Sequence, residues 1–108
     1  MNNYSNLVEA IIDLEARGYV VDFTIMGNSL LCAQDKIFLA RKEFNILEVY
    51  DFFDQEKGEN VSVYGIEAAD YGLKGILLEK PGIHYATSPP FLQQKMAEYL
   101  SSYIGYWC

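Results

Sequence analysis

The G-x-x-G motif at residues 72 to 75 encloses one lysine, Lys74. A loop of this kind clamps a nucleic-acid backbone when it lies between two helices and basic residues surround it. Here the segments on both sides are rich in β-branched and aliphatic residues, which is typical of strands. We therefore interpret Gly72 as a turn between two antiparallel strands. Gly75 then occupies a strand position, either as a β-bulge or as a place where another part of the chain packs closely.

His84 is the only histidine of the chain, so any catalytic arrangement that uses an imidazole depends on it. The turn predicted at Pro81-Gly82 would bring His84 and Tyr85 to the same rim as Lys74 and Tyr64. This rim is a candidate site for a small-molecule ligand, and the alternative is a surface histidine after a turn. No Walker loop, dinucleotide fingerprint, nucleophile elbow or CxxC motif occurs. We predict no catalytic residue and no cofactor.

Four acidic residues surround Gly58, namely Asp51, Asp54, Glu56 and Glu59. Hard cations bind where several oxygen ligands converge, but the spacing of a calcium-binding loop is absent. Charged residues in this arrangement are typical of a solvated hairpin tip, where they also discourage edge-to-edge aggregation. We predict no metal site.

The composition excludes several classes of partner. The chain has 108 residues, 8 basic and 15 acidic, for a net charge of −7, and 51% are hydrophobic. This length and apolar content fit one domain, residues 1–108, and the negative charge disfavours nucleic acids and anionic membranes. Only two cysteines, Cys32 and Cys108, are present, which favours a reducing compartment. Because no signal peptide or membrane-spanning stretch is recognisable, we expect a cytoplasmic protein with no membrane partner.

Amphipathic periodicity predicts a helix near each end of the chain. The first covers residues 4–17 and ends at Gly18, and the last begins near Pro89. Candidate N-caps are Asn3 or Ser5 for the first helix and Thr87 or Ser88 for the last. The predicted apolar face of the last helix contains Leu92, Met96, Tyr99, Leu100 and Tyr103.

Short β-branched and aromatic runs, separated by turn residues, lie between the helices. They predict strands near 19–26, 29–33, 46–53, 61–68 and 73–79, with a further strand at 36–40 left open. Residues 41–44 are either one helical turn or a loop. Because the connections are too short for crossover helices, we expect an antiparallel sheet of about five strands. The predicted fold is α+β, with both terminal helices on one face of the sheet.

The C-terminal helix and tail contain many large side chains that are typical of interfaces. The candidate interface residues are Tyr99, Tyr103, Ile104, Tyr106 and Trp107. The alternative is that the tail folds back to complete the core.

Three segments resemble a family of short, uncharacterised bacterial proteins that often carry the label phosphoribosylpyrophosphate synthetase. They are residues 1–23, LARKEFNILEVYDFFD at 39–54 and VSVYGIEAADYGLKGILLEKPGIHY at 61–85. The resemblance implies a bacterial cytosolic protein with a small α+β fold. The acidic pyrophosphate-binding signature and ATP-handling loops of true synthetases have no matching positions here, so it implies no catalytic residue.

Together these observations favour a non-enzymatic module that binds an unknown protein partner and forms a homo-oligomer. The alternative is a binder of a nucleotide or phosphosugar, or a minor enzyme, that uses a site near Lys74 and His84.

Overall fold

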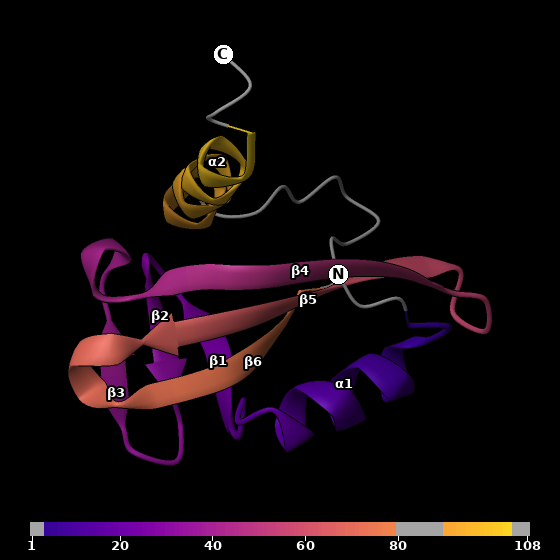
Figure 1. The fold of residues 1–108 in the computed structure, drawn as a ribbon, viewed down its shortest axis with the longest axis horizontal. Coiled ribbons are helices and arrows are strands. Elements are labelled where there is room, and N and C mark those ends of the chain that lie inside the picture. The colour runs from indigo at the N-terminus through magenta and orange to yellow at the C-terminus, as the bar shows by residue number, and fades with distance from the viewer. Residues whose placement is uncertain (1–3, 80–89, 105–108) are drawn as a thin grey trace.

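A computed structural model describes the backbone of residues 4–79 and 90–104, and the side chains of these residues except 102–104. The fold is α+β, as predicted, and consists of a six-stranded mixed sheet and two helices (Figure 1). The elements are α1 (Leu7–Ala16), β1 (Val21–Met26), β2 (Ser29–Cys32), β3 (Ile37–Leu39), the 3-10 turn η1 (Arg41–Glu43), β4 (Asn45–Asp54), β5 (Glu59–Ala68), the 3-10 turn η2 (Ala69–Tyr71), β6 (Leu73–Glu79) and α2 (Pro90–Ile104).

The sheet has the strand order β3-β2-β1-β6-β5-β4. All neighbouring strands are antiparallel except β1 and β6, which are parallel and pair Val21 with Gly75 and Phe23 with Leu77. The prediction of a purely antiparallel sheet of about five strands is therefore wrong. The reason is the short connection at residues 40–44, which takes the chain from β3 at one edge of the sheet to β4 at the other edge without reversing the strand direction. The antiparallel strands β4, β5 and β6 then bring β6 beside β1 in the same direction.

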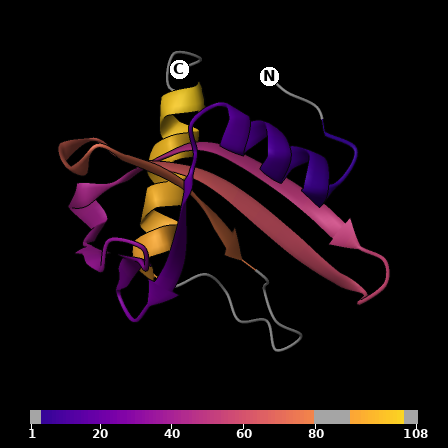
Figure 2. The same cartoon turned by 90° about the horizontal axis from the view of Figure 1, so that it is seen from below.

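The two helices lie on opposite faces of the sheet, so the prediction that both cover one face is also wrong (Figures 1 and 2). Neighbouring residues of a strand point to opposite faces. Val63 and Ile76 join the core cluster beneath α1, whereas Tyr64 and Leu77 join the cluster that contains the buried residues of α2. The apolar stripe of a helix predicts that the helix packs on the sheet, but it does not identify the face of the sheet. The nearly continuous burial along β5 reflects this two-sided cover.

The first helix begins one residue later than a Ser5 cap would give, because Asn6 is its N-cap. The Asn6 side chain accepts a hydrogen bond from the Glu9 backbone N–H at 2.9 Å. The backbone N–H of Ser5 donates to the Glu9 carboxylate at 3.2 Å, so Ser5 supports the cap from the preceding position. The predicted end at Gly18 is confirmed by its φ of 103°. The other proposed cap, Asn3, lies outside the described residues.

The turn chemistry around the G-x-x-G motif is confirmed. Gly72 has a φ of 66° and closes η2 between the antiparallel strands β5 and β6. A Cβ atom at Gly75 would lie 2.3 Å from the carbonyl oxygen of Val21 and 2.7 Å from Cε2 of Phe23. The structure also decides the two segments for which the sequence allowed alternatives. Residues 37–39 form strand β3, and residues 41–43 form the turn η1. The predicted turn at Pro81-Gly82 lies outside the described residues.

The second helix presents Phe91 and Leu92 to the core, with Met96 and Tyr99 half-buried beside them. Leu100 is 50% exposed, so its predicted place in the core is wrong. It lies two turns after Leu92, by which point the apolar stripe has rotated away from the sheet. The expected N-caps Thr87 and Ser88 lie outside the described residues.

Candidate functional site

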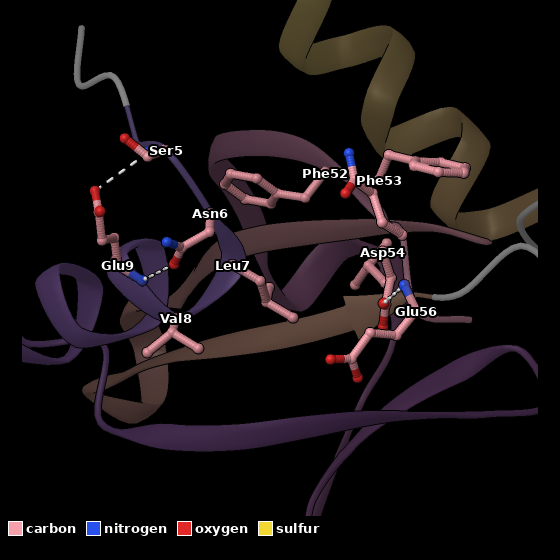
Figure 3. Close-up of a pocket in the computed structure, with 11 residues that line it drawn as sticks. Ser5, Asn6, Leu7, Val8, Glu9, Phe52, Phe53, Asp54 and Glu56 are labelled. Carbon is pink, nitrogen blue, oxygen red and sulfur yellow. Dashed lines mark hydrogen bonds between the residues drawn. The ribbon is translucent and has the colours of Figure 1, made fainter. Parts of the chain in front are cut away.

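A pocket lies where the N-terminal end of α1 faces the hairpin between β4 and β5 (Figure 3). Its volume is about 730 Å³, within the roughly 300–1,000 Å³ typical of ligand sites. The lining residues come from two stretches distant in sequence and one core position: Ser5, Asn6, Leu7, Val8, Glu9, Phe52, Phe53, Asp54, Gln55, Glu56 and Val61.

The floor of the pocket is apolar. Leu7 and Phe52 are half-buried and pack against the core cluster beneath α1, and Val61 is buried. Val8 is 63% exposed and forms an open side of the pocket. Figure 3 shows the ring of Phe52 on the side of α1 and the ring of Phe53 pointing away from it. The pocket therefore offers an apolar surface that a ligand or partner can cover.

The rim of the pocket is acidic. Asp54 accepts hydrogen bonds from the backbone N–H groups of Glu56 at 3.0 Å and Lys57 at 3.3 Å, which shapes the hairpin tip. Glu9 accepts the backbone hydrogen bond from Ser5 at the start of α1. The lining residues include these three carboxylates and no lysine, arginine or histidine. They also include no hydrogen-bonded pair of base and nucleophile.

Glu48 links β4 to the segment that follows α1 and so positions the wall of the pocket. It accepts two hydrogen bonds of 2.7 Å from the Arg17 guanidinium, one of 2.6 Å from the Tyr19 hydroxyl, and one from Tyr50. The pairing of β4 with β5 shifts by one residue between Ile46 and Glu48, and this bulge turns Glu48 to the α1 face. Burial alone would raise the pKa of Glu48, but these hydrogen bonds outweigh it and hold the pKa at about 2.

The Glu48 contacts continue into α1. Arg17 also bonds Asp13 at 3.0 Å, and the Tyr4 hydroxyl donates to the same carboxylate. These two hydrogen bonds lower the pKa of Asp13. The ring of Tyr4 meets that of Tyr50 edge-on, with centroids 4.9 Å apart. Asp13, Arg17 and Glu48 each have a charged or hydrogen-bonding partner in this network. We therefore interpret the network as structural contacts that hold α1 on the sheet.

The structure does not bring Lys74 and Tyr64 together. Lys74 is half-buried on the α1 face, with its ammonium 4.3 Å from the centroid of the Tyr19 ring. Tyr64 is buried on the α2 face, and its hydroxyl donates to Glu79 at 2.7 Å. His84 and Tyr85, the other members of that candidate site, lie outside the described residues.

Of the predicted interface residues, Tyr99 is half-buried and packs against the core cluster. The backbone of Tyr103 and Ile104 belongs to α2, but their side chains lie outside the described part of the chain, as do Tyr106 and Trp107. An interface formed by these residues stays a prediction.

The acidic hairpin tip is solvated, as the sequence indicates, since Asp51 and Glu56 are exposed and Asp51 accepts a hydrogen bond from Ser62 at 2.6 Å. Within the described ranges, no three histidine, cysteine or acidic side chains gather as metal ligands. Sequence reasoning missed the pocket, because its two walls are about 45 residues apart along the chain. The available signal was the apolar pair Phe52-Phe53 directly before the acidic turn.

Neither helix in the described segments is long and apolar enough to cross a membrane. No protein-family model matches the chain, and neither the curated proteins nor the solved structures contain a match to it.

Proposed function

We propose that the protein is a non-enzymatic interaction module that binds a protein partner through the pocket between α1 and the β4–β5 hairpin. The observation that carries this proposal is an apolar floor, formed by Leu7, Phe52 and Val61, with the exposed Val8 at its open side and a rim of carboxylates around it. Such a surface suits an apolar side chain that fills the pocket, with basic residues beside it in the partner.

Electrostatics favour the same kind of partner. The chain has a net charge of −7, and the rim contributes Glu9, Asp54 and Glu56. Opposite charge on a partner raises its association rate, an effect that salt reduces. Acidic segments and nucleic acids are repelled. The proposal therefore includes salt-sensitive binding of a basic, partly apolar segment, and self-association of the chain through another surface.

The pocket can be tested by NMR titration of the full-length chain with short synthetic peptides. One peptide has a Leu-Phe core flanked by lysines, and its matched control has glutamates in their place. The lysine peptide should shift the backbone amide signals of Leu7, Val8 and Phe52 with a strength that falls as salt is added. The glutamate peptide should leave them unchanged.

A matched pair of substitutions on α1 makes the test specific. Val8 and Ile12 are 63% and 62% exposed, one turn apart on the same helix, and only Val8 lines the pocket. Val8→Asn should weaken binding of the lysine peptide, and Ile12→Asn should not. Absence of binding, or equal weakening by both substitutions, would refute this function.

A further inference from the structure

Neither helix of the described residues covers the β1–β3 half of the sheet on the α1 face. Helix α1 packs mainly against β5 and β6 (Figure 1). The side chains that β1, β2 and β3 direct to the same face are therefore open to solvent. Phe38 is 58% exposed and Met26 49% exposed, which is unusual for large apolar side chains on strands.

These side chains form one continuous surface. Thr24 of β1 pairs with Leu31 of β2, and Leu31 pairs with Phe38 of β3. On the other side of β1, the parallel register that pairs Phe23 with Leu77 places Leu78 next to Thr24. Leu78 is 43% exposed. We call the surface formed by Thr24, Met26, Leu31, Phe38 and Leu78 the open sheet face.

The charge of the open sheet face indicates what covers it. Along the full length of β1 to β3, Asp22 is the only charged residue that points to this side, and it lies at one end of the sheet. Its carboxylate accepts a hydrogen bond from Gln34 at 3.4 Å. A basic partner would find no carboxylate at the centre. Two copies of a chain with a charge of −7 meet with least repulsion through an uncharged surface.

We propose that the open sheet face binds the same face of a second copy of this chain, with the two sheets stacked about 10 Å apart. The two copies are related by a twofold axis that lies between the sheets and runs perpendicular to the strands. This arrangement places the Asp22 end of one sheet opposite the far end of the other sheet, so the two Asp22 carboxylates stay apart. This proposal specifies the surface for the self-association included in the proposed function, and rests on it. Partner binding at the pocket uses other residues and is tested separately.

The size of the face sets the expected affinity. The face spans β1, β2, β3 and β6, which have six, four, three and seven residues. At about 3.3 Å per residue and about 4.8 Å between strands, they cover roughly 300 Å² in each copy. The two copies together bury about 600 Å², about half of the roughly 1,200 Å² at which stable interfaces begin. We therefore expect a weak dimer, with a dissociation constant of about 10⁻⁴ M or weaker.

Sedimentation of the full-length chain from about 10 µM to about 1 mM tests the proposal, since this range brackets that dissociation constant. The matched variants are Phe38→Asp, on the open sheet face, and Leu100→Asp, at a 50% exposed position on α2. Both replace an exposed apolar side chain by the same charge. The wild type and Leu100→Asp should dimerise as concentration rises, and Phe38→Asp should weaken dimerisation by at least tenfold. Met26→Asp should act like Phe38→Asp, and serves in its place if that variant unfolds.

Dilution of the wild type, followed by NMR, provides a second readout. Amide signals of Thr24, Leu31 and Phe38 should change with concentration, whereas those of the pocket should not. A wild type that is monomeric at the highest concentration overturns the proposal. So does a result in which Leu100→Asp weakens dimerisation as much as Phe38→Asp, because it assigns the contact to α2. Phe38→Asp should retain the response to the lysine peptide, which separates this proposal from the function of the pocket.

Discussion

Replacing Gly75 by alanine should strongly destabilise the protein. The new Cβ would lie 2.3 Å from the carbonyl oxygen of Val21, 2.5 Å from its Cγ2 and 2.7 Å from Cε2 of Phe23. The closest atom belongs to the backbone of β1, so no change of rotamer relieves the overlap. The strands β1 and β6 would have to separate by about 1 Å to restore an ordinary contact.

This separation affects the pairing that joins the two halves of the sheet, since β1 and β6 are the central neighbours in the strand order. Overpacking of a core costs about 1–3 kcal/mol, and a backbone contact belongs at the upper end of that range. We therefore expect Gly75→Ala to lower the free energy of unfolding by about 3 kcal/mol or more. A domain of this size has about 5–15 kcal/mol in total.

Urea unfolding followed by circular dichroism measures this loss. With a slope of about 1.5 kcal/mol/M, the midpoint should fall by about 2 M. Gly72→Ala is the matched control, because Gly72 has a φ of 66° and nothing lies within 4 Å of a Cβ atom there. That substitution carries only the backbone penalty of about 1 kcal/mol. The steric explanation is refuted if Gly75→Ala costs no more than Gly72→Ala.

Two further predictions concern charged groups in the structure. The pKa of Glu48 is about 2, below the ordinary 4.5, so its contribution to stability is present above about pH 4.5 and is lost as the pH falls towards 2. Stability should therefore fall more steeply in the wild type than in Glu48→Gln when urea unfolding is repeated between pH 5 and pH 2, and parallel pH profiles would contradict this. Lys95 is 5% exposed, and its ammonium reaches Asn45 and Glu98 only at 3.4 Å. The Glu98 side chain is 58% exposed, and an ion pair with one exposed partner and a long contact contributes little net stability. Lys95→Met should therefore be neutral or stabilising in the same assay, because it removes a buried charge, and a loss above about 2 kcal/mol would show that the charge is required.

Local features of the fold could be predicted from the sequence because they depend on residues that are adjacent in the chain. The positive φ of Gly72 follows from its place between two strand-like runs. A glycine inside a strand indicates either a bulge or a close approach, and the structure shows the close approach at Gly75. The six strand runs were all visible as β-branched and aromatic stretches, including the one at 37–39 that was left open.

The arrangement of those elements depends on contacts between distant residues, and here the prediction failed. Whether β6 lies beside β1 depends on the connection at residues 40–44, which takes the chain from β3 at one edge of the sheet to β4 at the other, and no local pattern records this. The apolar residues on both sides of β5, Val63 and Tyr64 among them, are the signal that would have placed the helices on opposite faces.

The candidate site escaped prediction for related reasons. The pocket combines Val8 with Phe52, which only the packing of α1 brings together. The role of Glu48 depends on the bulge after Ile46, because a shift of one residue decides which face a strand side chain occupies. The sequence shows the carboxylate but does not show the bulge.

The parallel pair of β1 and β6 also determines how the protein tolerates insertions. It joins residues 21 and 75, so the chain closes a loop of about fifty residues to form it. The entropy cost of closure grows with the logarithm of loop length, and a doubling costs only about 0.6 kcal/mol. Residues 33–36 form an exposed turn inside that loop and also connect β2 to β3. Four extra residues there double the short connection, at a cost of about 0.6 kcal/mol, and hardly change the long loop, which makes this turn suitable for a peptide tag or a fluorescent label.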